Sequence, residues 1–485
     1  MKIPEYGLSS EQVMGELRAA RGQDLDWRAG RCFAYIYDGG EEIERTAKAA
    51  YLEFLSENAL DPTVFPSLLR FERDVVAIGA EHLGGDPATT YGSFTSGGTE
   101  SILLAVKAAR DWARTHRPEV TRPRMAIPVT AHAAFHKAAH YLGLELDLVE
   151  VDPETYQAGP QHFEPHLGEQ TILLVGSAPG YPHGVCDDLE GIGRLALERG
   201  LLLHSDACMG GWMLPYFKRL GAPVRPFDLS VPGVTSISMD LHKYAYCPKG
   251  ASLVLYKDKE LKKHQIFSCS GWTGYTIINP TVQSTKSGGP LAAAWATLRS
   301  VGDRGYLDLA RPVYEATRAL VEGVRAIQGL RVMGEPEFCL IAVEGTEGVN
   351  PFQVVDEMNQ RGWYLQPQMG LRRPDGTHYR PNFHVSVNAS TADKAEAMLA
   401  DLREVVEQVR AAPQVDLAGQ VVAALSVMDA SKMSDEAFSS LLSMAGIQGT
   451  ELPERMATIH GLLDALPPEL ADRVLTVFFN ELTHG

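Results

Sequence analysis

A lysine that directly follows a histidine, Lys243 after His242, lies in the most distinctive passage of the chain. This passage, from Ser236 to Gly250, reads as a strand that runs into a loop holding the two residues before another strand. A lysine amine can form a Schiff base with an aldehyde cofactor when its surroundings let it exist without its proton. Taken alone, such a lysine is more commonly a surface residue, so the interpretation needs further support.

An aspartate, Asp206, follows the apolar run from Leu201 to His204. A carboxylate at the end of a buried strand can pair with a protonated pyridine nitrogen. That pairing lets the ring accept electrons when a bond to Cα breaks. The alternative for a single aspartate is a helix cap or a turn residue.

A glycine-rich turn and a histidine complete the set. Gly97, Gly98 and Thr99 precede a helical stretch, where close backbone approach and free N–H groups suit a phosphate. Structural capping is an equal alternative for this turn. His132 follows another predicted strand and could stack on an aromatic ring and assist proton transfer. Together with Lys243, these features predict a pyridoxal 5'-phosphate site.

The elements that must position these residues alternate between about Tyr91 and Tyr256. Short apolar runs there are separated by helical patterns, which is typical of a largely parallel sheet with helices on both faces. Functional residues of such a sheet are expected at the strand ends. The predicted strands are 124–129, 146–151, 171–175, 201–204, 236–239 and 251–256.

The length of 485 residues exceeds what one hydrophobic core serves, so several domains are expected. A small α+β unit is predicted from a helix over 308–328, strands over 331–333 and 340–343, a helix over 352–361, a strand over 384–387 and a helix over 392–411. Four tail stretches, 418–428, 435–444, 453–466 and 468–482, have helical spacing. We therefore expect an N-terminal helical segment (1–70), a large cofactor-binding domain (71–305), a small C-terminal α+β domain (306–412) and a helical tail (413–485).

Composition excludes several classes of function. A net charge of −17 argues against broad binding of nucleic acid or anionic lipid. The six cysteines contain no C-x-x-C pair, which favours reduced thiols in the cytoplasm and argues against a metal site. The N-terminus reads as a short amphipathic helix rather than a signal peptide, and no apolar run is long enough to span a bilayer.

Several passages resemble the group II pyridoxal-phosphate decarboxylase family and, within it, the sphingosine-1-phosphate lyases. The resemblance implies an α/β fold of type I, with a mostly parallel seven-stranded sheet flanked by helices and a smaller C-terminal domain. It also implies a homodimer whose two active sites draw on both subunits. The resembling passages are 58–76, 93–111, 131–143, 177–187, 204–212 and 236–256.

The resemblance also implies roles for single residues. Lys243 carries the cofactor, Asp206 pairs with its ring nitrogen and His132 stacks on its ring. The residues expected near the cofactor phosphate are Gly97, Gly98, Thr99 and His242. Those matching family positions near the substrate are Tyr37, which would assist catalysis, Asn58 and Lys249.

Departures from the family pattern fall in the region expected to bind the substrate. Asp61 stands where a histidine is usual, and a carboxylate there would repel a phosphate. Thr285 and Lys286 lie in a loop, Pro280 to Gly289, that is expected to approach the partner's site, and Lys286 replaces an arginine. His460 replaces a tyrosine of the tail. Asp61 could instead pair with Lys249 or His460.

The leading hypothesis is therefore a carbon–carbon lyase. It would cleave a phosphorylated 2-amino-3-hydroxy compound, such as a sphingoid-base phosphate, by a retro-aldol reaction to an aldehyde and an amino phosphate. The alternative is an amino-acid α-decarboxylase, which would use the same cofactor residues and break the bond to a carboxylate instead. A third alternative is a cofactor-binding relative without catalysis.

Overall fold

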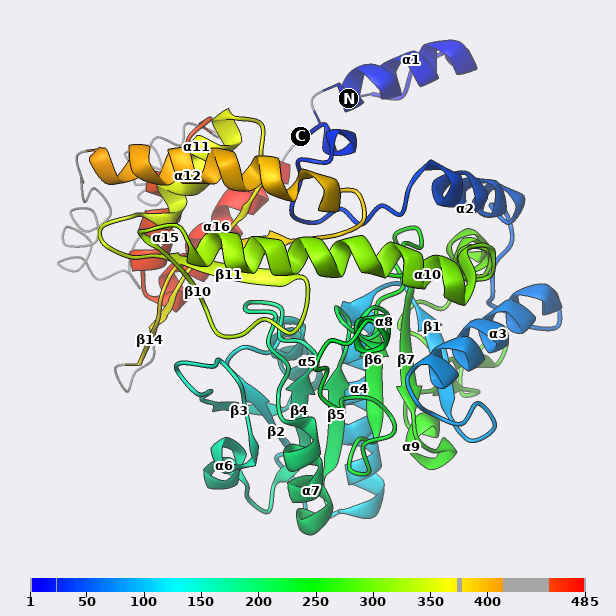
Figure 1. Cartoon of the computed structure of the whole chain (residues 1–485). Helices are drawn as coiled ribbons and strands as arrows, with labels where there is room; N and C mark the ends of the chain where they lie inside the picture. The colour runs from blue at the N-terminus through cyan, green and yellow to red at the C-terminus, as the bar shows by residue number, and fades with distance from the viewer. Residues whose placement is uncertain (1, 23, 373–376, 413–452, 484–485) are drawn as a thin grey trace.

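A computed structural model of the chain describes residues 2–22, 24–372, 377–412 and 453–483. Its centre is a seven-stranded sheet in the order β1-β7-β6-β5-β4-β2-β3 (Figure 1). Only β7 runs antiparallel to its neighbours, so the expected mostly parallel α/β fold is confirmed. The strands are β1 (Tyr91–Thr95), β2 (Arg124–Pro128), β3 (Glu145–Val149), β4 (Thr171–Ser177), β5 (Leu202–Asp206), β6 (Ser236–Met239) and β7 (Ser252–Tyr256).

Both faces of the sheet are covered by helices, as the continuous apolar strands require. In β4, Leu174 packs into one hydrophobic cluster, while Leu173 and Val175 pack into the cluster on the opposite face. This alternation follows from the two-residue period of a strand. The helices are α4 (Gly98–His116) and α5 (Ala134–Leu142) on one face, and α3 (Pro66–His82), α7 (Leu189–Arg199) and α8 (Leu214–Arg219) on the other.

The long helix α10 (Gly288–Arg325) links the two larger parts of the chain. It crosses between the seven-stranded sheet and a four-stranded antiparallel sheet of order β10-β11-β15-β12 (Figure 1). The boundary predicted at 305/306 therefore falls within α10, close to a kink at Gly302, where φ is +63°. The elements of the second part are β10 (Leu330–Val332), β11 (Leu340–Gly345), α11 (Pro351–Gln360), β12 (Gln366–Gln368), β15 (Asn382–Ser386) and α12 (Ala395–Ala411).

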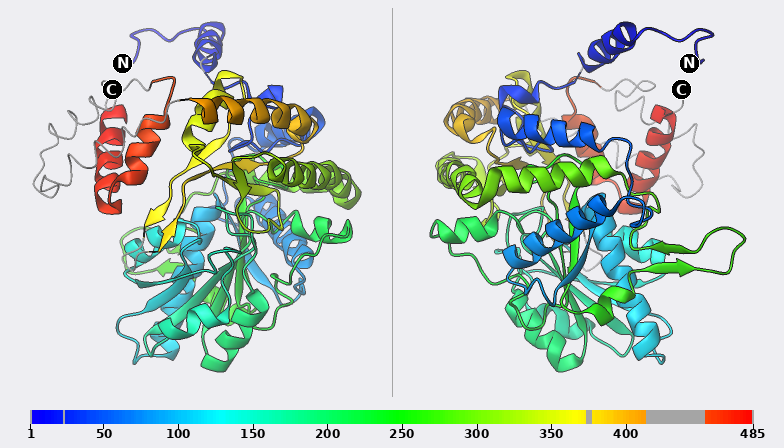
Figure 2. Two further views of the ribbon diagram at one scale, coloured as in Figure 1. Left: turned by 60° about the vertical axis from the view of Figure 1, so that its left-hand side comes forward. Right: turned by 90° about the vertical axis from the view of Figure 1, so that its right-hand side faces the viewer.

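The N-terminal helices differ in how they are packed. Helix α2 (Glu41–Glu53) packs against α10, whereas α1 (Ser10–Arg21) contains no buried residue and stands away from the body (Figures 1 and 2). Figure 2 also shows the hairpin of β8 (Phe267–Cys269) and β9 (Ile277–Asn279) projecting from the large domain.

The tail contains α15 (Ala457–Ala465) and α16 (Pro468–Thr483), close to the last two helices predicted there. The predicted helices over 418–428 and 435–444 lie outside the described residues. Helix α15 packs against α11. Among the helices in the described parts of the chain, none is long and apolar enough to cross a membrane.

Candidate active site

A cavity of about 370 Å³ lies where the carboxyl ends of the parallel strands meet the start of α4. This is the position expected for a ligand in a sheet of this kind. The cavity gathers every residue predicted to hold the cofactor, although these come from distant parts of the sequence. The lining includes Gly97, Gly98, Thr99, His132, Asp206, His242 and Lys243.

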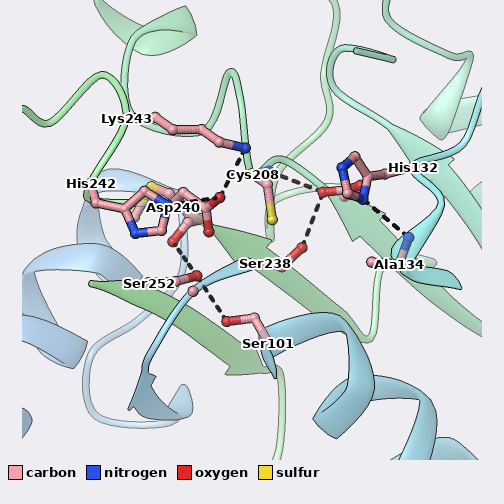
Figure 3. A network of polar contacts seen from close by, with 12 residues as sticks. Ser101, His132, Ala134, Cys208, Ser238, Asp240, His242, Lys243 and Ser252 are labelled. Atoms are coloured by element: carbon pink, nitrogen blue, oxygen red, sulfur yellow. Dashed lines mark hydrogen bonds and ion pairs between the residues drawn. The ribbon is translucent and has the colours of Figure 1, made fainter. Parts of the chain in front are cut away.

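A buried carboxylate, Asp240, lies against Lys243 in this cavity. The Lys243 Nζ atom is 2.9 Å from Asp240 Oδ2, and Asp240 is 3% exposed (Figure 3). Burial opposes the charge on Lys243, but Asp240, with smaller effects from Cys208 and Tyr37, outweighs it and raises the lysine pKa. Burial likewise acts to raise the pKa of Asp240, yet Lys243 and His242 bring it below its ordinary value. Asp240 therefore favours the charged form of Lys243.

The start of α4 provides a cradle that fits a phosphate. Gly97 forms the N-cap without a side-chain hydrogen bond, and a Cβ at Gly98 would lie 2.7 Å from Asp240 Oδ2 and 3.0 Å from Cys208 Sγ. Only glycine fits at 98, so the backbone N–H groups of the first turn are left accessible. His242 borders the cradle, and burial lowers its pKa to about 4 although Asp240 opposes this.

Asp206 faces the same cavity from the end of β5. Its Oδ1 accepts hydrogen bonds from the Cys208 N–H at 3.1 Å and the Ser238 hydroxyl at 3.3 Å. His132 forms part of the wall, and its Nδ1 accepts the Ala134 N–H at 3.1 Å (Figure 3). Burial lowers the His132 pKa, which Asp206 partly opposes. The cavity thus offers four partners to an aldehyde-bearing pyridine phosphate. They are the Lys243 amine, the Asp206 carboxylate, the His132 imidazole and the glycine-rich turn that fits a phosphate.

Tyr37 and Lys249 lie in an adjacent cavity of about 320 Å³, which shares His242 with the first. The Lys249 ammonium donates to the Tyr35 carbonyl at 3.2 Å and lies 4.9 Å from the centre of the Tyr37 ring. Burial and the nearby Lys243 charge lower the Lys249 pKa to about 8. Burial also raises the pKa of Tyr37, although Lys243 opposes the shift.

Asn58 and Asp61 lie in the loop between α2 and α3, outside both cavities. The Asn58 side-chain oxygen accepts the Leu60 N–H at 3.1 Å. Asp61 Oδ1 accepts from the Thr63 N–H at 2.8 Å and the Thr63 hydroxyl at 2.7 Å, so it forms a turn on the surface. The pairing of Asp61 with Lys249 or His460 is not observed among the described residues. Asp61 instead lines a largely apolar cavity of about 640 Å³ beside the β8–β9 hairpin.

Thr285 and Lys286 follow this hairpin but point differently. Thr285 is exposed, whereas the Lys286 side chain is 8% exposed and its Nζ lies 2.7 Å from Glu72 Oε1. Lys286 also donates to the Phe94 carbonyl at 3.3 Å. Its charge is thus already paired within this chain, and the substrate contact expected of it remains a prediction.

His460 lies on α15, where its ring centroid is 5.6 Å from that of Phe352 on α11. Burial lowers its pKa, and Asp356 opposes the shift. His460 does not line the cofactor cavity of this chain. Its predicted role at the substrate is likewise untested.

The cavity also contains polar side chains that were not predicted, among them those of Asp240, Tyr181 and Glu100. Asp240 lies within the passage that contains Lys243, and Tyr181 follows the end of β4, where a functional residue of such a sheet is expected. Glu100 accepts the Ser96 N–H and hydroxyl with Oε2 and the Val282 N–H with Oε1. It therefore ties the phosphate cradle to the loop 280–289, and only the structure reveals that link.

Comparison with protein families gives two matches. Residues 57–344 match the pyridoxal-dependent decarboxylase conserved domain, which covers more than half of the chain. Residues 419–481 match a family described as a C-terminal HTH domain of pyridoxal-dependent enzymes.

Comparison with individual proteins gives similar results. The sphingosine-1-phosphate lyase of Arabidopsis thaliana is 40% identical over 85% of this chain and 74% of its own length. A probable L-aspartate decarboxylase of Pyrococcus furiosus is 29% identical over 77% of this chain and 97% of its own length. The solved sphingosine-1-phosphate lyase of Burkholderia pseudomallei superposes with a TM-score of 0.78 and 36% identity, covering 89% of this chain and 97% of that one.

Proposed function

The chain belongs to the pyridoxal-dependent decarboxylase family, whose members use pyridoxal 5'-phosphate, and we propose that it is a carbon–carbon lyase of this family. The proposed reaction is the retro-aldol cleavage of a phosphorylated 2-amino-3-hydroxy compound of the sphingoid-base type. Its products are an aldehyde and an amino phosphate. The main support is the cavity that is lined by Lys243, Asp206, His132 and the glycine cradle. The chain that forms it is 40% identical to a sphingosine-1-phosphate lyase.

The cofactor would be held by groups at opposite ends of the cavity. Lys243 would carry it covalently, the first turn of α4 would bind its phosphate, and Asp206 would face its ring nitrogen. When bound, the cofactor supplies an electron-accepting ring that stabilises the charge left at Cα after a bond breaks. His132, uncharged because burial lowers its pKa, is suited to lie flat against that ring.

The chain itself supplies groups that hold or move protons. Tyr181 lines the cavity, and burial raises its pKa to about 12, so its hydroxyl stays protonated and donates to the Gln366 side chain. Lys249, with a pKa of about 8, can gain or lose a proton near neutral pH. We propose that these two residues and Tyr37 handle the substrate hydroxyl proton and the phosphate.

We further propose a homodimer in which Asn58, Asp61, Thr285, Lys286 and His460 contribute to the partner's substrate site. In this chain they lie away from Lys243, and exposed apolar side chains gather around the β8–β9 hairpin and α3. Such a patch is typical of an interaction surface. These side chains are Val64, Leu69, Ile266, Phe267, Trp272, Tyr275, Ile278 and Val282.

A reducing compartment, the cytoplasm, is proposed as the location. The support is that all six cysteines are free in the structure. There the enzyme would act in the breakdown of sphingolipids.

The decisive experiment compares two substrate classes with the cofactor-loaded enzyme. Incubation with a sphingoid-base phosphate should release aldehyde, whereas a panel of amino acids should release no carbon dioxide. Because the family also contains decarboxylases and a probable aspartate decarboxylase is 29% identical, carbon dioxide without aldehyde would establish the alternative function.

A further inference from the structure

Two neighbouring strands place four polar side chains in a row behind the cofactor cavity. On β5, His204 and Asp206 are two residues apart and so point to the same side. On β6, Ser236 and Ser238 have the same spacing. The parallel register pairs His204 with Ser236 and Asp206 with Ser238, which brings the four side chains together.

These side chains form a continuous chain of hydrogen bonds. His204 Nδ1 lies 2.8 Å from the Ser236 hydroxyl, and His204 Nε2 lies 3.1 Å from the Ser238 hydroxyl. Ser238 in turn lies 3.3 Å from Asp206 Oδ1. His204 and Ser238 are fully buried, and the Phe135 ring meets the His204 ring edge-on at 5.9 Å. These hydrogen bonds are therefore shielded from solvent.

The chemistry of the groups fixes the direction of every bond. A carboxylate can only accept, so the single hydroxyl hydrogen of Ser238 is donated to Asp206. Ser238 must then accept from His204, which places the ring proton on Nε2. Burial lowers the His204 pKa to about 4, against the influence of Asp206, so the ring is neutral. Its Nδ1 accordingly accepts the proton of Ser236.

We propose that Ser236, His204 and Ser238 are positioning residues that fix Asp206 for the ring nitrogen of the cofactor, an inference that rests on the proposed cofactor role of Asp206. Ser238 and the Cys208 N–H hold Oδ1, and among the described residues no hydrogen bond is found on Oδ2. Oδ2 is thus the oxygen presented to the cavity. Because the imidazole in this hydrogen-bond network is neutral, the network orients the carboxylate without neutralising it, so the charge remains available to a protonated ring.

The alternative is that His204 has only a structural role, as a buried histidine whose two ring nitrogens are both hydrogen-bonded. A matched pair of variants separates the two, because Thr and Val have nearly the same shape and only Thr keeps a hydroxyl. The dissociation constant of pyridoxal phosphate should rise about tenfold in Ser238→Val, the loss of roughly 1.4 kcal/mol. It should stay close to the wild-type value in Ser238→Thr. Equal affinities in the two variants would overturn the proposal.

A control variant tests whether the effect is specific to this face of β5. Ser205 lies between His204 and Asp206, points to the other side and donates to the Phe227 carbonyl at 2.7 Å. Ser205→Ala should reduce stability without changing the affinity for the cofactor. A loss of affinity as large as that of Ser238→Val would show that general loosening of β5 suffices, and would defeat the proposal.

A second measurement does not depend on any variant folding correctly. Nitrogen-15 NMR of the cofactor-free chain at neutral pH should show His204 as the neutral tautomer protonated at Nε2. Protonation at Nδ1, or a charged ring, would contradict the hydrogen-bond directions assigned to Ser236, His204 and Ser238. Both the affinity and the tautomer are independent of the substrate, so a failure of the lyase assay leaves them unaffected.

Discussion

The Nζ atom of Lys243 lies 2.9 Å from Oδ2 of Asp240, three positions earlier in the chain. Asp240 is buried and Lys243 is half-buried, and both line the cavity that must receive the cofactor. Only an uncharged amine can attack an aldehyde, so Asp240 keeps the lysine in its unreactive form until the cofactor enters.

Asp240→Asn should therefore accelerate covalent uptake of the cofactor near neutral pH. Each unit by which the lysine pKa falls increases the uncharged fraction about tenfold. Stopped-flow absorbance with the cofactor-free protein measures the rate. In the wild type the rate should increase as the pH rises, and in the variant it should increase less steeply. Identical pH profiles would mean that Asp240 does not control the lysine charge.

The same substitution should flatten the dependence of stability on pH. The Asp240 pKa is lowered, so its contribution exists above the ordinary aspartate pKa and is lost as the pH falls through the lowered value. The Lys243 pKa is raised, so its contribution exists below the ordinary lysine pKa and is lost as the pH rises through the raised value. Denaturant unfolding of the cofactor-free wild type and variant at acidic, neutral and alkaline pH measures both contributions to stability.

Lys243→Ala should abolish covalent attachment of the cofactor. After borohydride reduction, mass spectrometry should detect the added cofactor on the wild type and not on the variant. Lys218→Ala, at the exposed end of α8, serves as the matched control and should retain the cofactor. Attachment that survives in Lys243→Ala would assign the role to another lysine.

Tyr181→Phe should reduce kcat while leaving the cofactor in place. Its hydroxyl remains protonated up to a pH of about 12 and lies in the cavity wall, so its removal should cost roughly 10²-fold in rate if it serves in proton transfer. Tyr141→Phe removes an exposed hydroxyl and is the control. A change confined to cofactor affinity would contradict this role.

The ion pair between Lys286 and Glu72 should matter for stability. Replacing Lys286 by Met leaves Glu72 without its cation in a largely buried place and should cost about 3 kcal/mol of unfolding free energy. The double variant Lys286→Met, Glu72→Gln should lose less than the sum of the single changes. A double-mutant cycle by urea unfolding gives the coupling, and additive losses would rule out a stabilising pair.

Asp61→Asn should improve turnover of phosphorylated substrates. Asparagine preserves the turn with Thr63 and removes a charge that would repel a phosphate, so kcat/KM should rise roughly threefold at low salt and less at high salt. Asp61→His, which introduces the histidine usual in the family, should act in the same direction. An unphosphorylated analogue is the control and should respond to neither change.

The cofactor cavity could be predicted because its residues carry local signals. Asp206 ends an apolar strand and Gly97 precedes a helix, so each pattern indicates a place at the same sheet edge. Asp240 has no such signal, since its partnership with Lys243 depends on the tight turn that follows β6. Six strands of the sheet could be predicted from short apolar runs, whereas β1 was not among them and the number seven was implied by the family resemblance.

Contacts between distant segments could not be predicted. Lys286 reads as a free cation in a loop, but its partner Glu72 is 214 positions away. The domain boundary at 305/306 was placed just before the helix expected over 308–328. In the structure the backbone at Gly302 is non-helical, with φ +63° and ψ 171°, so two helices meet at a kink there within the span of α10.

Helix α10 also limits how this enzyme can exchange parts with its relatives. It begins directly after the loop that contains Lys286, packs along α2 and ends where β10 of the small domain begins. A chimera joined at 305/306 would take the kink at Gly302 from one parent and nearly all of the following helix from the other, so the two parents would have to match in rotation and in their contacts. Recombination should therefore succeed more often at the turn between Ala326 and Gly329, where both helices of α10 and the kink between them come from one parent.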